Sequence, residues 1–485
     1  MLPLLPSLFL LLSAAPENDL ESEARKFSEF YSIVESQAAD PLVPEKAFYD
    51  GAIPGMLRRL DPHSVFLNPE QFDQLKRMQE SRSKGFGTVV SVVPGRVIIL
   101  QTLAGTPSAK AGLAPGDEII AINGIQMNRL GVEQIIGLLG ASRQRPVNMD
   151  VRRPGNVRTL QFVLTPEEMQ SPSVERAFLL KPDVGYVRIS SFDAETGKQL
   201  REAIERLGGA GLKGLVLDLR NNPGGLLPAA LETASLFLKS GQRLLAVRGR
   251  AIEPGEEKVP ETSRPYEFPL AVLVNEKSAS GSEIIAGSLQ DHDRAAIVGE
   301  PSFGKGLVES VYPLSEATAL ALTTAFYYTP SGRSIQKPLR DGGQLDASTS
   351  RRPDQEFRTD SGRVVKGGGG IQPDLVVWQE QLSRLQMVLE ASSSITSFAI
   401  EYTRKHAPIT ESFDVTPEVL DDFQAFLSPR NIRPGVGEWL RYRDWISNRL
   451  KTEVFNQAFG VARGDEVEAQ RDPVILAALK ALGFE

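Results

Sequence analysis

The spacing of hydrophobic residues divides the chain into regions of different character. Residues 16 to 83 contain apolar residues at i, i+3 and i+4, as in FSEFYSIVES, which predicts a helical segment with a break at Asp61-Pro62. Residues 84 to 166 contain short strand-like runs instead, among them Phe86 to Val93, together with one helical run, GVEQIIGLLGA. We therefore expect an N-terminal helical segment followed by a small unit rich in strands.

Residues 167 to 380 alternate between buried strands and helices. VGYVRISSF and GLVLDLR have the composition of strands, whereas ETGKQLREAIERL and PAALETASLFL have helical spacing, and this alternation predicts a layered α/β core. The stretch from Lys337 to Gly370 is rich in Gly, Arg and Asp and is expected to form a mobile loop. Residues 381 to 485 show amphipathic helical spacing and predict a helical region that packs on the core or on a sister subunit. The fold class is multidomain α+β.

The first fifteen residues, MLPLLPSLFLLLSAA, form an apolar run of the length found in signal peptides. We expect a signal peptide over residues 1 to 15, cleaved near Ala15, and hence an exported protein in the periplasm or another extracytoplasmic space. The run lacks the usual positive charges, so an uncleaved segment that keeps the protein at the membrane is the alternative. It is short for a membrane-spanning helix.

Composition excludes several classes of function. A net charge of −7 argues against nucleic acid or an anionic membrane as the main partner. The absence of cysteine excludes thiol catalysis and disulfide bonds. The sequence contains no metal-ligand cluster and no nucleotide-binding loop, since the four glycines before Ile371 resemble a hinge more than a phosphate cradle. We therefore expect no cofactor.

The serine-rich run SASGSE, Ser278 to Glu283, is the strongest candidate for chemistry. It follows the strand-like PLAVLVN and precedes helical spacing from Ile284 to Leu289, so the serines are expected on a strand-to-helix turn. The free N–H groups and the positive dipole end of a helix N-terminus stabilise an alkoxide or an oxyanion. A serine-rich run is also common as a simple helix cap, so this motif needs a partner.

A serine nucleophile requires a base, and Lys305 is the best-placed candidate. It lies between two glycines after the apolar run AAIVGE, and a lysine acts as a base where burial removes its proton near neutral pH. The chain has three histidines, none of them in a comparable glycine-framed setting: His63, His292 and His406. His63 in the sequence LDPHS stays open as a weaker rival, because Asp-Pro-His-Ser is a good turn and capping sequence in its own right.

SASGSE followed by Lys305, 25 residues after Ser280, resembles the carboxy-terminal processing peptidases, also called tail-specific proteases. The resemblance extends over roughly residues 45 to 378. It implies a crotonase-like catalytic core in which Ser280, rather than Ser278 or Ser282, is the nucleophile and Lys305 is the base.

The segment LVLDLRNNPGGLL, Leu215 to Leu227, matches the same family. The resemblance implies that the backbone at Gly224 and Gly225 forms one half of an oxyanion hole and the N–H of Gly281 the other half. Two positions depart from the family pattern. Glu309 stands where a glutamine usually follows the lysine by four residues, and we assign it an orienting role that also favours the charged lysine. Gly281 replaces an alanine, with a mild expected effect.

Residues 84 to 166 resemble a PDZ domain. The resemblance implies that the loop residues Gly85, Phe86 and Gly87 bind the terminal carboxylate of a peptide through backbone N–H groups, while the neighbouring strand pairs with the peptide main chain. The expected partners are therefore proteins or peptides with free C-termini. The C-terminal helical region is a candidate surface for a homo-oligomer.

Together these features predict a serine endopeptidase that recognises protein C-termini and cleaves with a Ser280/Lys305 dyad. One alternative is an inactive PDZ scaffold that only binds C-terminal tails, which Glu309 favours and the intact dyad opposes. Another is a different crotonase-like activity, such as acyl-thioester chemistry, in which a PDZ domain has no obvious role.

Overall fold

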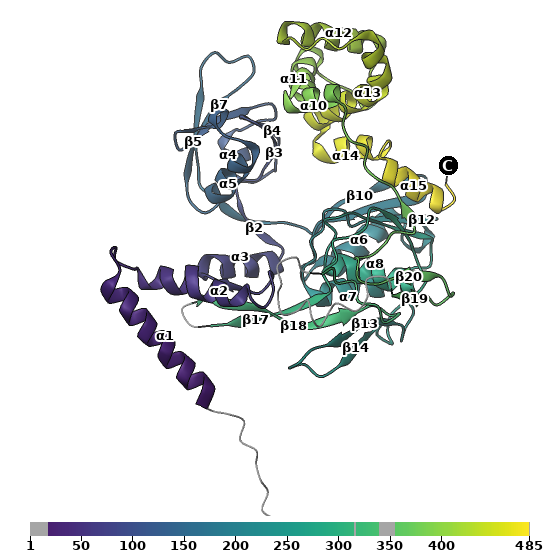
Figure 1. The fold of residues 1–485 in the computed structure, drawn as a ribbon. Helices are drawn as coiled ribbons and strands as arrows, with labels where there is room; N and C mark the ends of the chain where they lie inside the picture. Colours follow the sequence, from purple (N-terminus) through teal and green to yellow (C-terminus); the bar gives the residue numbers. More distant parts are fainter. Residues whose placement is uncertain (1–17, 315–316, 339–354, 485) are drawn as a thin grey trace, which may run out of the picture.

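The computed structural model describes residues 18–314, 317–338 and 355–484, and Figure 1 shows how they are arranged. A central α/β body carries an N-terminal helical segment on one side. A small β unit and a C-terminal helical region lie above this body in the view of Figure 1. The predicted signal peptide and residues 339–354 of the predicted mobile loop lie outside the described residues. Within the described residues, no helix has both the length and the hydropathy needed to cross a bilayer.

The central body is built on a mostly parallel sheet in the order β10-β11-β12-β15-β16-β21. Only β10 is antiparallel to its neighbour. Its strands are β10 Val174–Lys181, β11 Val184–Ile189, β12 Gly214–Asp218, β15 Leu270–Val274, β16 Ala296–Gly299 and β21 Leu375–Val376. Burial on both faces explains why β12 and β15 are continuous apolar runs rather than alternating ones.

Helices cover both faces of this sheet. On one face lie α6 Thr196–Leu207, α7 Leu227–Ser235 and α8 Gly281–Asp291, and on the other lies α15 Pro473–Ala481. Side chains of β12 alternate between the two cores: Leu215 and Leu217 face the first set of helices, whereas Val216 faces α15. The C-terminal helix is therefore part of the central body's own core.

A second sheet lies below the first in Figure 1 and contains β1, β18, β13 and β14, with β17 also paired to β18. Its strands are β1 Val65–Leu67, β13 Arg243–Arg248, β14 Gly255–Lys258, β17 Leu307–Pro313 and β18 Ala319–Tyr328. The expectation of helix throughout residues 16 to 83 is wrong at β1, because Val65 pairs with Ala321 of β18. Pairing with a distant strand decides the structure of this short segment.

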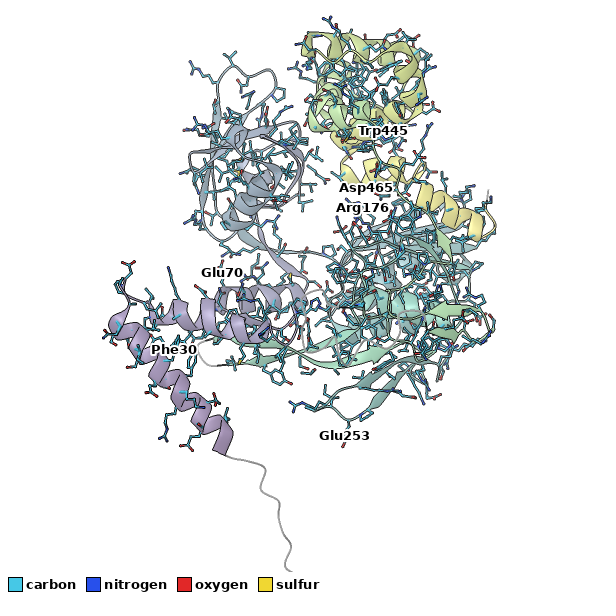
Figure 2. All side chains as sticks on the ribbon, in the orientation of Figure 1. Phe30, Glu70, Arg176, Glu253, Trp445 and Asp465 are labelled. Atoms are coloured by element: carbon cyan, nitrogen blue, oxygen red, sulfur yellow. The ribbon has the colours of Figure 1, made fainter. Side chains whose placement is uncertain are left out.

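The N-terminal segment is otherwise mainly helical, although its last residues also differ from the expectation, since Arg82 and Ser83 begin the strand β2 Arg82–Gly85. Its helical part consists of α1 Asn18–Gln37, a π-helical stretch over Lys46–Ala52, α2 Ile53–Leu57 and α3 Pro69–Gln79. The predicted break at Asp61-Pro62 is confirmed: the Asp61 carboxylate accepts hydrogen bonds from the N–H groups of His63 (2.7 Å) and Ser64 (2.8 Å). Helix α1 projects from the body with Phe30 on its surface (Figure 2).

The small β unit is rich in strands, as predicted, and the helical run GVEQIIGLLGA forms its helix α5. Its elements are β3 Thr88–Val93, β4 Arg96–Thr102, α4 Pro107–Ala111, β5 Glu118–Ile122, β6 Ile125–Gln126, the 3₁₀ turn Met127–Arg129, α5 Val132–Ser142, β7 Val147–Arg152 and β8 Leu160–Leu164. The strand β3 lies at an edge of this sheet, and β2 Arg82–Gly85 pairs with β9 Glu167–Gln170 as a ribbon that joins the unit to the body. The open edge of β3 leaves backbone groups available to a further strand.

The C-terminal region is helical, as the sequence predicts. It contains α10 Arg384–Ala391, α11 Ser394–His406, α12 Pro417–Leu427, the 3₁₀ turn Ser428–Arg430, α13 Val436–Phe459, α14 Val461–Ala469 and α15. Ser393, with φ of 51°, separates α10 from α11. The region packs on the central body, which confirms one of its two expected packing modes, and it also contacts the small β unit, where Val461 N–H donates to Gln101 (3.0 Å).

The predicted mobile loop from Lys337 to Gly370 contains regular structure in its described part. Strands β19 Glu356–Arg358 and β20 Val364–Lys366 form a hairpin. Backbone hydrogen bonds hold two of the glycines that follow: the N–H groups of Gly368 and Gly370 donate to the carbonyls of Ser334 (2.7 Å) and Ile335 (2.9 Å). The expectation of an unstructured hinge is wrong here, because backbone hydrogen bonds fix these glycines.

Candidate active site

The serine-rich run forms a sharp turn between β15 and α8. Ser280 has φ of 52° and ψ of −112°, a backbone conformation that is costly for any residue other than glycine. The carbonyl of Ser280 accepts the first helical hydrogen bonds, from Glu283 (2.8 Å) and Ile284 (2.9 Å). Strain of this kind at a helix N-terminus is expected where a side chain must be presented to a reaction.

The three serines of the run differ in accessibility. Ser278 and Ser282 are fully buried, and their hydroxyls donate to the carbonyls of Leu219 (2.8 Å) and Asn222 (3.0 Å). Ser280 is only half-buried. The two outer serines thus hold the turn in place, which leaves Ser280 as the serine of the run that a substrate can reach.

The buried carboxylate of Glu283 joins the serine turn to the segment that carries Lys305. Its Oε2 accepts from the N–H of Ser280 (3.0 Å) and of Lys305 (2.9 Å), and its Oε1 accepts from Gly304 N–H (2.7 Å) and the Ser302 hydroxyl (2.5 Å). Burial raises the pKa of Glu283 to about 7, and these four hydrogen bonds oppose that rise. The sequence places Glu283 within the SASGSE motif but predicts no role for it.

Tyr327 of β18 makes a second link between the same two residues. Its buried hydroxyl lies within hydrogen-bonding distance of the carbonyls of Lys305 (2.8 Å) and Ser280 (3.3 Å). Burial, together with the negative charge of Glu283, raises the pKa of Tyr327 well above its usual value, so the phenol keeps its proton. The backbones of Ser280 and Lys305 are therefore fixed to one another by two buried side chains.

The side chain of Lys305 contacts Glu309, as the spacing of four residues predicts. Lys305 Nζ donates to Glu309 Oε1 at 3.0 Å, and the two side chains are 18% and 30% exposed. Among the residues that the structure describes, Lys305 Nζ and the Ser280 hydroxyl form no hydrogen bond with each other. The structure thus shows the lysine as a partly buried member of an ion pair, next to the serine turn.

The turn after β12 lies directly against Ser280. A Cβ atom at Gly224 would be 2.8 Å from that of Ser280, and one at Gly225 would be 2.1 Å from the carbonyl oxygen of Phe192, so both positions require glycine. Gly224 N–H donates to Asn222 Oδ1 (2.8 Å), whereas no group among the described residues accepts from the N–H of Gly225 or Gly281. Of the three glycines predicted for an oxyanion hole, Gly225 and Gly281 keep a free donor.

Local packing explains why residue 281 is a glycine where the resembling family usually has an alanine. A Cβ atom there would be 2.9 Å from the ring of Phe192 and 3.2 Å from the methyl group of Ala230. An alanine at this position would require the Phe192 ring to shift, so glycine fits the local packing better than the residue usual in the resembling family.

His63 lies close to the Lys305–Glu309 pair, although the sequence gave it little weight. The Ser64 hydroxyl accepts from Thr323 N–H (3.1 Å), and Thr323 of β18 lies opposite Glu309 of β17. Burial and then the charge of Lys305 lower the pKa of His63, against the opposing charges of Glu309 and Asp61, so the imidazole is neutral near neutral pH. The pairing of β1 with β18, which no local motif announces, brings this histidine to the site.

The other two histidines have structural environments. His292 lies with Nδ1 2.7 Å from an Asp360 carboxylate oxygen and Nε2 2.8 Å from the carbonyl of Arg243. His406 stacks on Tyr402 at the exposed end of α11. Among the residues that the structure describes, no group of three His, Cys, Asp or Glu side chains could hold a metal ion.

The loop from Lys84 to Gly87 precedes the edge strand β3. The carbonyls of Phe86 and Gly87 accept from Ser108 (3.0 Å) and Leu103 (2.8 Å), but within the described ranges their N–H groups meet no acceptor. Beside the loop is a cavity of about 380 Å³ lined by the basic residues Lys84 and Arg143, among others. Free N–H groups, nearby positive charge and an open strand edge are the features that a carboxylate-terminated peptide requires.

Comparisons with known proteins agree with this geometry. The profile of Peptidase family S41 matches residues 183–348, and that of the PDZ domain matches residues 98–153. The first match includes Gly225, Ser280 and Lys305, whereas the second lies within the small β unit.

Relatives match over a longer stretch. A carboxy-terminal-processing protease of Bartonella bacilliformis is 34% identical over 327 residues, which cover 66% of this chain and 74% of the relative. A carboxyl-terminal-processing protease of Synechocystis is 36% identical over 292 residues, 59% of this chain and 68% of the relative. Among solved structures, a photosystem II D1 C-terminal processing protease matches with 27% identity and a TM-score of 0.41, over 74% of this chain and 88% of that one. The chain belongs to the carboxy-terminal processing proteases of family S41, and it is accordingly a serine endopeptidase with a PDZ domain.

Proposed function

We propose that the protein binds the free C-terminus of a protein substrate in its PDZ domain and cleaves that substrate with Ser280 as nucleophile and Lys305 as base. In this proposal residues 84–166 select the substrate and residues 167–380 cleave it. The observation that carries the proposal is the Glu283 carboxylate, which accepts from the N–H of both Ser280 and Lys305 and so holds nucleophile and base together.

The chemistry follows from the residues around the turn. The Ser280 hydroxyl attacks the substrate carbonyl while a neutral Lys305 amine takes its proton, and the resulting ammonium returns that proton to the leaving amine. The N–H groups of Gly225 and Gly281, free of other acceptors among the described residues, donate to the oxyanion. Water then repeats the cycle on the acyl-enzyme and releases the new C-terminus.

Glu309 orients Lys305, but its negative charge also opposes the role of Lys305 as a base. Its carboxylate holds Lys305 by a hydrogen bond of 3.0 Å, but an ionised carboxylate also favours the ammonium form, which cannot accept a proton from Ser280.

Recognition of the C-terminus rests on the loop before β3. The terminal carboxylate would accept from the N–H groups of Phe86 and Gly87, with Gly85 leading into the loop, and the peptide backbone would extend the sheet at β3. Lys84 and Arg143 add positive charge beside it.

Location and assembly complete the proposal. The apolar run of residues 1–15, ahead of an acidic stretch, supports export to the periplasm or another extracytoplasmic space, with attachment through an uncleaved segment as the variant of this idea. The C-terminal helical region, residues 381–485, is the candidate surface for a homo-oligomer.

The first prediction concerns the dyad. Ser280→Ala and Lys305→Ala should each lower kcat by about 10⁴-fold or more, because each removes half of one proton-transfer unit. Lys305→Arg should be equally inactive, since a guanidinium keeps its proton. Cleavage of an unfolded protein substrate measures the rates, and circular dichroism verifies folding. His63→Asn is the matched control and should retain activity. The lysine assignment is wrong if Lys305→Arg cleaves substantially while His63→Asn does not.

The second prediction concerns Glu283. Glu283→Gln replaces one accepting oxygen by an NH₂ group that faces two donors, so the geometry of Ser280 and Lys305 relaxes. We expect kcat to fall by about 10²-fold with little change in KM, the pattern of a lost transition-state interaction. Glu276→Gln, an exposed change in the same loop, should have no effect. A change confined to KM would contradict the role given to Glu283.

The third prediction concerns substrate recognition. A substrate that ends in a free carboxylate and apolar residues should be cleaved with a KM roughly tenfold lower than the same substrate with an amidated C-terminus, because amidation removes the charged acceptor. Deletion of residues 84–166 should abolish this difference. Equal KM values for the two substrates with the intact protein would remove the PDZ domain from substrate selection.

The fourth prediction concerns Glu309. Glu309→Gln keeps an oxygen that accepts from Lys305 but removes the negative charge that favours an ammonium over an amine. The rising limb of kcat/KM should therefore move toward lower pH, and the rate near neutrality should increase. Profiles of kcat/KM against pH for the variant, the wild type and the Glu276→Gln control measure the shift. Superimposable profiles for Glu309→Gln and wild type would show that the pair is too well solvated to matter.

A further inference from the structure

The end of strand β12 carries a buried group of charges that the proposed mechanism does not use. The Arg220 guanidinium donates to the Asp218 carboxylate at 2.6 Å and to Asp472 Oδ2 at 2.7 Å, and Asp218 also accepts from the Tyr186 hydroxyl (2.7 Å). The side chains of Arg220 and Asp218 are 12% and 2% exposed. One guanidinium is thus held between two carboxylates, one from the central body and one from the C-terminal region.

Asp472 is the N-cap residue of α15, a helix that lies outside both matched profiles. It caps that helix: its Oδ1 accepts from the N–H of Val474 (2.8 Å) and Ile475 (3.2 Å), while its other oxygen faces Arg220. A helix-cap aspartate needs only one oxygen for its helix. The second oxygen of Asp472 therefore serves the central body.

Arg220 is directly followed by the turn that approaches Ser280. Asn221, with φ of 61°, exchanges two hydrogen bonds with Asn275 before the serine run (2.9 and 3.0 Å). Asn222 then accepts from Gly224 N–H and from the Ser282 hydroxyl. Because two carboxylates hold Arg220, its position determines where this turn begins. Gly225 lies five residues after Arg220, in the same turn.

We propose that Asp472 is a positioning residue for catalysis, through which the C-terminal helical region fixes Arg220 and hence the turn that presents Gly225 to the oxyanion. Asp472 does not touch the substrate. The inference rests on the oxyanion role proposed above for Gly225.

The alternative is that Asp472 merely docks the C-terminal region, and the structure offers a matched control for that. Arg176 of β10 forms a similar ion pair with Asp465 of α14 (Figure 2). Both pairs join the C-terminal region to the central sheet, and both line the same cavity of about 170 Å³. Arg176 lies on the edge strand β10 and connects to the end of β12 only through the strand ladder of β11, whereas Arg220 itself precedes Gly225 by five residues.

The test compares Asp472→Asn with Asp465→Asn in the full-length protein. Asparagine keeps an accepting oxygen for the α15 cap but removes the charge that faces Arg220. For Asp472→Asn we expect kcat to fall about tenfold while KM stays within twofold, because the interaction acts only through the oxyanion. For Asp465→Asn we expect both constants to be unchanged. Asp472→Ser, which retains a capping hydroxyl, repeats the test if the asparagine variant does not fold.

A peptide boronate gives a second readout, because it bonds to the serine oxygen and places its own oxygen in the oxyanion site. Its affinity should fall about tenfold in Asp472→Asn and not in Asp465→Asn. Equal losses in the two variants, or wild-type kcat and affinity in Asp472→Asn, would overturn the inference. Failure of the wild-type protein to bind the boronate through Ser280 would instead refute the proposed function itself.

Discussion

The active site depends on one buried carboxylate. Glu283 is fully enclosed, and an enclosed carboxylate is stable only where donors replace the water it has lost. Its four donors come from the serine turn and from the segment of Lys305, so both segments must be in place before the charge is satisfied. The same requirement stabilises the strained backbone of Ser280, because relaxing that turn would leave part of the carboxylate unsatisfied.

Two cation–carboxylate arrangements in the protein illustrate why residue type matters. Lys305 pairs with Glu309 and can lose its proton, so its charge state changes during the proposed reaction. Arg220 lies between Asp218 and Asp472 and keeps its charge throughout, which suits a permanent structural anchor. A lysine in the place of Arg220 would lose the forked geometry, and an arginine in the place of Lys305 would lose the proposed base.

Local sequence patterns predicted much of this protein, but not the contacts that complete the site. SASGSE and the glycine-framed Lys305 were sufficient to locate the serine turn and the lysine, and short strand-like runs located most strands of the small β unit. Tyr327 and His63 reach the site through strand pairing, and Asp472 reaches Arg220 through helix docking, all over long sequence separations. Such contacts leave no periodic signal near the residues concerned, which is why β1 was expected to be helical.

The C-terminal region touches both the central body and the PDZ domain, and the two sets of contacts differ in kind. Toward the body it offers a packed helix, α15, and buried ion pairs such as that of Asp472 with Arg220. Toward the PDZ domain, Arg96 donates to Ser392 and Ser397 at 3.4 and 3.5 Å, and Gln101 accepts from Val461. A packed helix and an ion pair between two ionised groups hold more strongly than hydrogen bonds from one guanidinium to neutral oxygens, so the body holds the C-terminal region more tightly than the PDZ domain does.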